Sequence, residues 1–151
     1  MVNLTGNLFK YKTAVAMFNT HTFKAKLMAS GITFNRATMT KWADVSASEL
    51  TTLHGYTVGG VSLSGIAIAE DDTNHKATVK WSNPSWTASG GSIGPSAGLM
   101  VIDDTDTDKM LVMYIPFVDA SGNRSEQTQA DGGVFTIAGV EYDQVDTIVA
   151  D

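Results

Sequence analysis

Short stretches in which apolar and polar residues alternate recur along the chain, and polar turns separate them. In residues 22–30, Phe23, Ala25 and Leu27 alternate with polar residues, and Gly31 follows as a stop. A period of two places successive side chains on opposite faces of a strand, as a half-buried sheet requires. The composition agrees, because the chain has 18 Thr and 12 Asp but only 4 Glu, and Thr suits strands whereas Glu suits helices. The sequence therefore predicts a mainly β fold.

Turn-rich segments divide the rest of the chain into expected strands. EDDTN at residues 70–74 and DDTDTDK at residues 103–109 are typical hairpin turns. Two hairpins and two further strands are expected at residues 61–81, 97–117, 134–140 and 145–150, with a loop at 120–133. Roughly five to eight short strands at this spacing indicate a β-sandwich or jelly-roll-like domain. We expect residues 22–151 to form this single domain, and residues 1–21 to form a basic N-terminal arm or its first element.

The clearest helix signal lies at residues 44–53. Ser46 and Glu49 have the spacing of a capping box, in which each side chain bonds to the backbone of the other residue. Leu50 and Leu53 follow on one face. We therefore expect one short helix in this segment.

Residues 3–20 allow two interpretations. Apolar residues recur at the spacing of an amphipathic helix, at Leu8, Tyr11, Val15 and Phe18. The neighbouring Lys10 and Lys12 instead alternate with aromatic residues, as in a strand. The sequence leaves both conformations open.

The net charge of −6 is unevenly distributed. Residues 1–43 carry basic residues and no acidic one, whereas residues 44–151 carry all 16 acidic residues. One interpretation is that the two parts pack together and neutralise each other. The other is that the N-terminal third faces an acidic partner. On that second interpretation, the contact residues are Lys10, Lys12, Lys24, Lys26 and Arg36.

Several classes of function are disfavoured. Cysteine is absent, which excludes disulfides, thiol nucleophiles and Cys-ligated metals. We expect no signal peptide and no membrane association, because the N-terminus lacks an apolar core and no stretch approaches the ~18 apolar residues of a membrane helix. The net negative charge argues against nucleic-acid binding, since phosphate contacts need a basic surface. No motif of the catalytic or nucleotide-binding repertoire occurs, so we expect neither an enzyme nor a bound cofactor.

The acidic turn is the nearest approach to a metal site. Asp104, Asp106 and Asp108 have the spacing of the first three ligands of a calcium loop. However, Lys109 stands where the sixth residue should be Gly, and Ile115 where the twelfth should be Glu. A solvated hairpin tip accounts better for this run, so we expect no metal here.

The most unusual segment is WSNPSWTASGGSIGP, at residues 81–95. Trp81 and Trp86 carry large apolar areas that could cover one end of a sandwich. Glycines reach backbone conformations that other residues avoid. The aromatic residues are therefore expected to join a structural turn that contains Gly90, Gly91, Gly94 and Pro95. The alternative is an exposed aromatic platform for a sugar, but the flanking strands need a cover, which favours the structural role.

This segment, as WxxPxWTASGGSIGP, resembles the signature of a widespread group of tailed-bacteriophage virion proteins. Similar stretches follow the same order, namely TFKAKLMAS at residues 22–30, ADVSASEL at 43–50, GYTVGG at 55–60, VIDDT at 101–105, YIPF at 114–117 and DGGVFTI at 131–137. The resemblance covers about residues 22–140. It implies a structural virion component that decorates or cements the capsid, and it brings no catalytic residues.

On this resemblance we expect a protein at the capsid surface that binds the major capsid protein and associates with itself as a homotrimer. A basic segment would engage an acidic face of the capsid. Alternatives are a head–tail connection component, or a tail- or fibre-associated module that binds a receptor or glycan. The fibre-associated module would need an exposed aromatic groove around Trp81 and Trp86.

Overall fold

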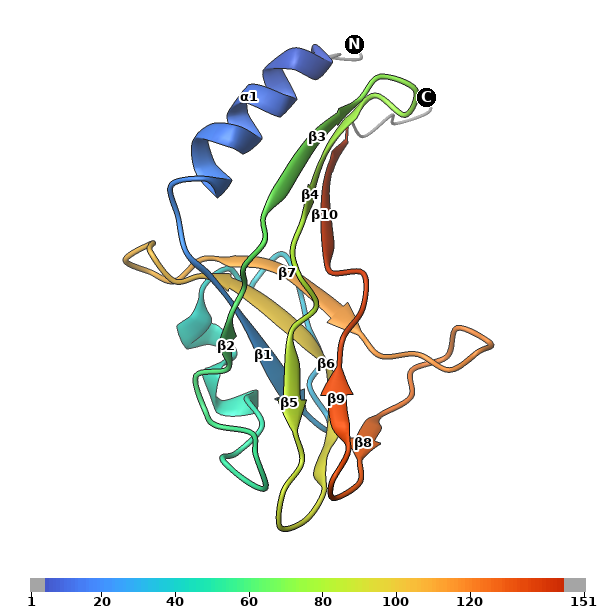
Figure 1. Cartoon of the computed structure of the whole chain (residues 1–151). Coiled ribbons are helices and arrows are strands. Elements are labelled where there is room, and N and C mark those ends of the chain that lie inside the picture. The colour runs from blue at the N-terminus through green and yellow to red at the C-terminus, as the bar shows by residue number, and fades with distance from the viewer. Residues whose placement is uncertain (1–4, 146–151) are drawn as a thin grey trace.

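The computed structural model describes residues 5–145, which form one helix, two short 3-10 turns and ten strands. Helix α1 spans Asn7–Phe18, and the 3-10 turns η1 and η2 span Trp42–Asp44 and Ser46–Ser48. The strands are β1 (Phe23–Ala29), β2 (Val61–Ser62), β3 (Ala67–Asp71), β4 (Lys76–Lys80), β5 (Ser85–Thr87), β6 (Ile93–Asp103), β7 (Leu111–Pro116), β8 (Gln127–Gln129), β9 (Val134–Thr136) and β10 (Glu141–Val145). The mainly β prediction is confirmed, and all the strand pairs are antiparallel (Figure 1).

The largest sheet has the strand order β2-β1-β6-β7, and β8 pairs with the first part of β6. The long strand β6 is central and is buried on both faces. Leu99 and Val101 belong to one apolar cluster, and Met100 and Ile102 belong to a second cluster on the opposite face. This explains why the part of β6 from Ala97 to Ile102 is continuously apolar, with no alternation.

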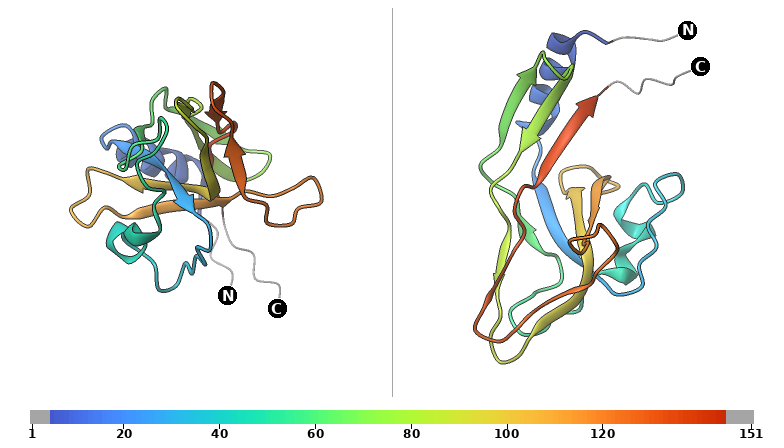
Figure 2. Two further views of the ribbon diagram at one scale, coloured as in Figure 1. Left: turned by 90° about the horizontal axis from the view of Figure 1, so that it is seen from below. Right: turned by 90° about the vertical axis from the view of Figure 1, so that its right-hand side faces the viewer.

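The larger cluster lies between this sheet and two smaller ones, β10-β4-β3 and β5-β9. Phe23 of β1 stacks on Phe18 of α1 with a ring-centroid distance of 4.9 Å, and it lies 5.8 Å from the ring of Trp81. One face of α1 packs on β3 and β4 (Figure 2). Of the two interpretations of residues 3–20, the helix is the one formed. Helix α1 contributes Ala14 and Phe18 to the core of the domain.

The face of α1 that packs inward only partly matches the apolar stripe in the sequence, of which Tyr11 and Phe18 pack in the core. Its buried residues are Lys10, Ala14 and Phe18, which are spaced four apart. Leu8, which begins the expected stripe, is 54% exposed. The reason is tertiary, because the Lys10 ammonium donates a 2.7 Å hydrogen bond to the carbonyl of His75 in the β3–β4 turn, and that bond satisfies a buried charge.

The helix expected at residues 44–53 is not formed. This segment contains η1 and η2, and the chain after them is extended. Leu50 donates its backbone N–H to the carbonyl of Leu27 at 2.8 Å. Glu49 and Met28 form an isolated antiparallel β-bridge. Glu49 therefore does not cap a helix, since its carboxylate lies against β1, where it meets a buried lysine.

Both expected hairpins are present, as β3–β4 and β6–β7. The expected loop at residues 120–133 contains the short strand β8. The expected strand at 134–140 is shorter, as β9. Of the strand expected at 145–150, the first residue ends β10, and residues 146–150 lie outside the described part.

Candidate partner-binding surface

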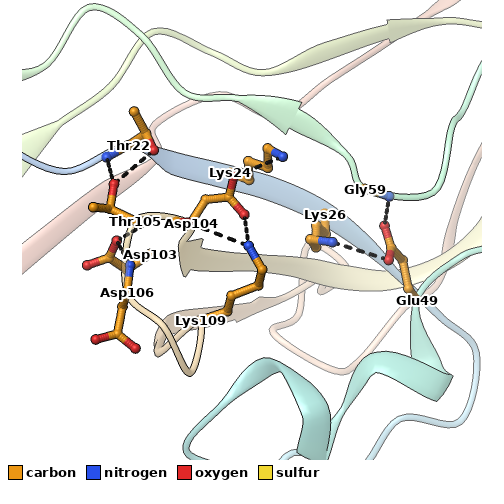
Figure 3. Close-up of polar contacts among 10 residues, drawn as sticks. All are labelled: Thr22, Lys24, Lys26, Glu49, Gly59, Asp103, Asp104, Thr105, Asp106 and Lys109. Atoms are coloured by element: carbon orange, nitrogen blue, oxygen red, sulfur yellow. Dashed lines mark hydrogen bonds and ion pairs between the residues drawn. The ribbon is translucent and has the colours of Figure 1, made fainter.

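Three of the five expected contact cations are engaged within the fold. Lys10 is 1% exposed and bonds to His75 as described above. Lys24 of β1 pairs with Asp104 at 3.0 Å, and Lys26 pairs with Glu49 at 3.4 Å (Figure 3). For Lys24 and Lys26, the interpretation in which the basic and acidic parts of the chain neutralise each other describes the structure, whereas Lys10 bonds to a backbone carbonyl. Lys10 and Lys26 are buried, so their ammonium groups are not available to a partner in this conformation.

Lys26 is the centre of a buried polar network. Its ammonium lies 4.0 Å from the ring centroid of Trp42, which gives it a cation–π contact. The Glu49 carboxylate also accepts hydrogen bonds from the Tyr56 hydroxyl at 2.8 Å and from the Gly59 N–H at 2.6 Å. Burial lowers the pKa of Lys26, and Glu49 opposes that shift. Burial, reinforced by the bond to Glu49, raises the pKa of Tyr56. The network joins β1 to the 49–59 segment, and alternation alone had placed Lys26 on a solvent face.

The acidic turn after β6 is also bound internally. Asp104 accepts hydrogen bonds from Lys109 at 2.6 Å and pairs with Lys24 (Figure 3). The hydrogen bond from Lys109 has the largest effect in lowering the pKa of Asp104, and the contact with Lys24 lowers it further. Asp106 accepts the backbone N–H of Asp108 at 2.9 Å, which is ordinary turn chemistry.

Two further contacts fix the base of this turn. The fully buried carboxylate of Asp103 lies 2.5 Å from Nδ1 of His21 and accepts the backbone N–H of Thr105 at 3.0 Å. Among residues 5–145, no cluster of three or more His, Asp or Glu is placed to hold a metal ion.

Lys12 and Arg36 are the two expected contact residues that stay available. Both are exposed, and neither makes an ion pair with any residue of the range 5–145. Lys12 lies on α1 and Arg36 on the segment that covers the second face of the central sheet. They are therefore the members of the predicted set that a partner could reach.

The outward face of α1 adds two apolar side chains to Lys12. Leu8 and Phe9 are 54% and 66% exposed, and Lys12 follows them at four and three residues, so all three share the face opposite the core. We call Leu8, Phe9 and Lys12 the α1 ridge. The two apolar members could not be predicted from the sequence, because Leu8 fitted the expected buried stripe. The sequence signal for the buried face of α1 is the four-residue spacing of Lys10, Ala14 and Phe18, and the charge of Lys10 obscures it.

The tryptophan-rich segment is built into the core. Trp81 and Trp86 are each 5% exposed, and the ring centroid of Trp86 lies 5.8 Å from that of Tyr56. An exposed aromatic groove, which a sugar platform would need, is therefore not formed by these two rings. These two tryptophans belong to the core of the molecule.

The glycines of this segment allow close packing at positive φ. A Cβ on Gly91, where φ is +147°, would lie 2.5 Å from the imidazole ring of His54. A Cβ on Gly94, where φ is +116°, would lie 2.7 Å from the carbonyl oxygen of Gln127. Gly90 also has positive φ, at +75°, and Pro95 is an exposed residue of β6. A side chain at Gly91 or Gly94 would thus separate neighbouring segments.

Comparisons with protein-family profiles, with curated protein sequences and with solved structures give no match for this chain. Among residues 5–145, no helix has both the length and the apolar character needed to span a bilayer.

Proposed function

We propose that the protein is a structural virion component that decorates or cements the capsid of a tailed bacteriophage by binding its major capsid protein. The observation that carries the proposal is the α1 ridge, which holds two exposed apolar side chains beside a cation that makes no ion pair with residues 5–145. Exposed apolar side chains next to a charge are typical of surfaces that dock on another protein. The similarity of residues 22–140 to phage virion proteins supports the same function.

The proposed contact set is smaller than the charge distribution suggested. It consists of the α1 ridge and Arg36, because Lys10, Lys24 and Lys26 are engaged inside the fold. Apolar burial by Leu8 and Phe9 would supply most of the affinity, and the two cations would orient the protein on an acidic capsid face. We also propose that the protein sits between capsid subunits as a homotrimer, an arrangement that would repeat the α1 ridge around a symmetry axis.

Binding to capsids that lack the decoration protein tests this proposal. The change is Phe9→Ser combined with Lys12→Ala, and sedimentation of capsids with bound protein is the measurement. We expect the double variant to bind at least tenfold more weakly, since the loss of one apolar contact and one charge amounts to about 1.4 kcal/mol or more.

The matched control is Thr13→Ser combined with Lys80→Ala. It alters α1 and removes one exposed charge, but it leaves the α1 ridge intact. If the Phe9→Ser, Lys12→Ala variant bound capsids as tightly as the unchanged protein, the α1 ridge would not be the capsid contact. Higher salt should weaken binding of the unchanged protein only modestly, because two cations take part instead of five.

A further inference from the structure

Strand β7 is an edge strand that holds an unusually apolar sequence. Among the strands of residues 5–145 it pairs with β6 alone, and it reads Leu-Val-Met-Tyr-Ile-Pro. Apolar edge strands usually invite pairing with another chain unless something covers or interrupts them. The segment at Thr40 covers only the start of β7, where Leu111 donates its N–H to the Thr40 carbonyl at 3.0 Å. The edge from Val112 to Pro116 is left without a strand partner in the described part of the chain.

The backbone of this edge points outward at Tyr114. Phe117 donates its N–H to Ala97 at 3.0 Å, toward β6, and the backbone groups of an antiparallel strand alternate in direction. The N–H and C=O of Tyr114 therefore face away from β6. Pro116 lies at the next outward position, where the missing N–H of proline breaks no bond of the sheet.

Apolar hollows lie on both faces of the sheet beside the first part of β7. One, of about 230 Å³, lies between β7, α1 and β10 and is lined by Met17 and Tyr142. The other, of about 420 Å³, lies between β7 and the 34–40 segment and is lined by Phe34 and Met39. Val112 lines both hollows. In Figure 1, β7 crosses the middle of the molecule beneath α1 and β10. An added strand would thus find the backbone groups of Tyr114 and the carbonyl of Pro116 as partners, and a place for its side chains on either face near Val112.

The charges at the hollows indicate which strand fits. Arg36 lines the larger hollow, is exposed and has no ion pair with any residue of the range 5–145. No acidic residue of the range 5–145 lines either hollow. A strand with a carboxylate on this face would pair with the guanidinium, whereas a basic strand would be repelled.

A second copy of the chain is a poor occupant for the same reason. β7 itself contains no acidic residue, so pairing two β7 edges would supply no carboxylate to Arg36. A twofold axis normal to the sheet would also bring both Arg36 side chains to the same face, where like charges are unfavourable.

We propose that the outer edge of β7 binds an extended segment of a partner polypeptide as an added strand, with apolar side chains in the hollow beside α1 and a carboxylate facing Arg36. The strand-binding activity rests on the geometry of β7 alone. That the partner strand belongs to a capsid subunit rests on the proposed function.

Peptide binding to the full chain tests this proposal without any capsid. The probes are capped octapeptides that alternate Val or Ile with Glu, and amide NMR and hydrogen exchange of the ¹⁵N-labelled protein are the measurements. We expect shifts along β7 and the flanking hollows, and slower exchange of the Tyr114 amide once it donates to the peptide. Fully N-methylated peptides of the same sequence, which have no backbone donors, should not bind.

Arg36 provides the side-chain arm of the test. Arg36→Ala should weaken binding of the Glu peptides about tenfold, and peptides with Lys in place of Glu should bind the unchanged protein more weakly by a similar factor. The matched control is Lys80→Ala, because Lys80 is an exposed cation that pairs with Glu141 at 3.1 Å on the face of its sheet opposite the core. This control should bind the Glu peptides as the unchanged protein does.

Four outcomes would overturn the proposal. These are equal binding of the N-methylated peptides, shifts confined to other surfaces, no binding by any peptide at millimolar concentration, and dimerisation through β7 in the absence of peptide. A protein that binds the peptides but not capsids would contradict the proposed function and leave strand binding intact. A protein that binds capsids but no peptide would contradict strand binding and leave the proposed function intact.

Discussion

At the scale of single residues, the burial of Lys26 changes the meaning of the basic N-terminal third. A lysine in a strand that alternates with apolar residues is ordinarily assigned to solvent. Here the second face of the sheet is covered by residues 30–50, so Lys26 is only 6% exposed and needs Glu49 as a partner. The sequence placed Glu49 in a helix cap instead. Nothing local indicates the pairing, because the two residues meet only when the 49–59 segment folds onto β1.

The first prediction concerns this buried pair. Glu49→Gln should lower the free energy of unfolding by about 3 kcal/mol, because it leaves the Lys26 charge buried without a counter-charge. Urea unfolding followed by circular dichroism measures the change. A second substitution, Lys26→Met, removes the orphaned charge. The double variant should therefore be more stable than Glu49→Gln alone, and a double variant that is no more stable would contradict the account.

The second prediction concerns pH and Asp104. Its pKa is lowered in the folded state by Lys109 and Lys24, so the unfolded chain binds the proton more readily. The stabilisation is fully present above the ordinary aspartate pKa, near 3.9, and is lost as the pH falls through the folded value. Asp104→Asn should cost roughly 0.5–1 kcal/mol at pH 7, since the two lysines are partly exposed, and less at pH 2. Thermal unfolding at the two pH values measures this difference.

Asp108→Asn is the matched control for that prediction. It removes an exposed carboxylate of the same turn, and this carboxylate makes no ion pair with residues 5–145. The control should change stability little at either pH. If Asp104→Asn lost as much stability at pH 2 as at pH 7, the loss would not come from the charge.

At the scale of elements, hairpins could be predicted from the sequence, whereas the helix could be predicted only as one of two conformations open to residues 3–20. The β3–β4 and β6–β7 hairpins follow from polar turns between alternating strands, which are local signals. The position of the helix depends on tertiary contacts. Residues 44–53 carry a capping-box pattern but are held in an extended path by β1, whereas α1 forms with a lysine on its buried face.

The third prediction compares two phenylalanines of α1. Phe18 is 4% exposed and packs on Phe23, Trp81 and Tyr142, so Phe18→Ala should cost about 3–5 kcal/mol. Phe9 is 66% exposed, so Phe9→Ser should change stability by less than about 0.5 kcal/mol. Urea unfolding of the two variants measures both effects. Equal losses would mean that α1 packs by another face.

At the scale of the whole molecule, internal pairing explains part of the uneven charge. Lys24 and Lys26, from the basic third, meet carboxylates from the acidic body, and Lys10 meets a backbone carbonyl. The sequence could predict that opposite charges exist to be paired. It could not predict which cations stay exposed, because this depends on which faces of α1 and β1 are covered. Lys12 and Arg36 are identified only by the folded arrangement.

Capsid binding is the proposed function of this molecule, and imaging of capsids with bound protein tests it. Purified protein is mixed with decoration-free capsids of a tailed phage, and the particles are reconstructed by electron cryomicroscopy. We expect regular added density between capsid subunits at symmetry axes, with the α1 ridge against the shell. Particles without added density, or with density at one unique vertex alone, would contradict it.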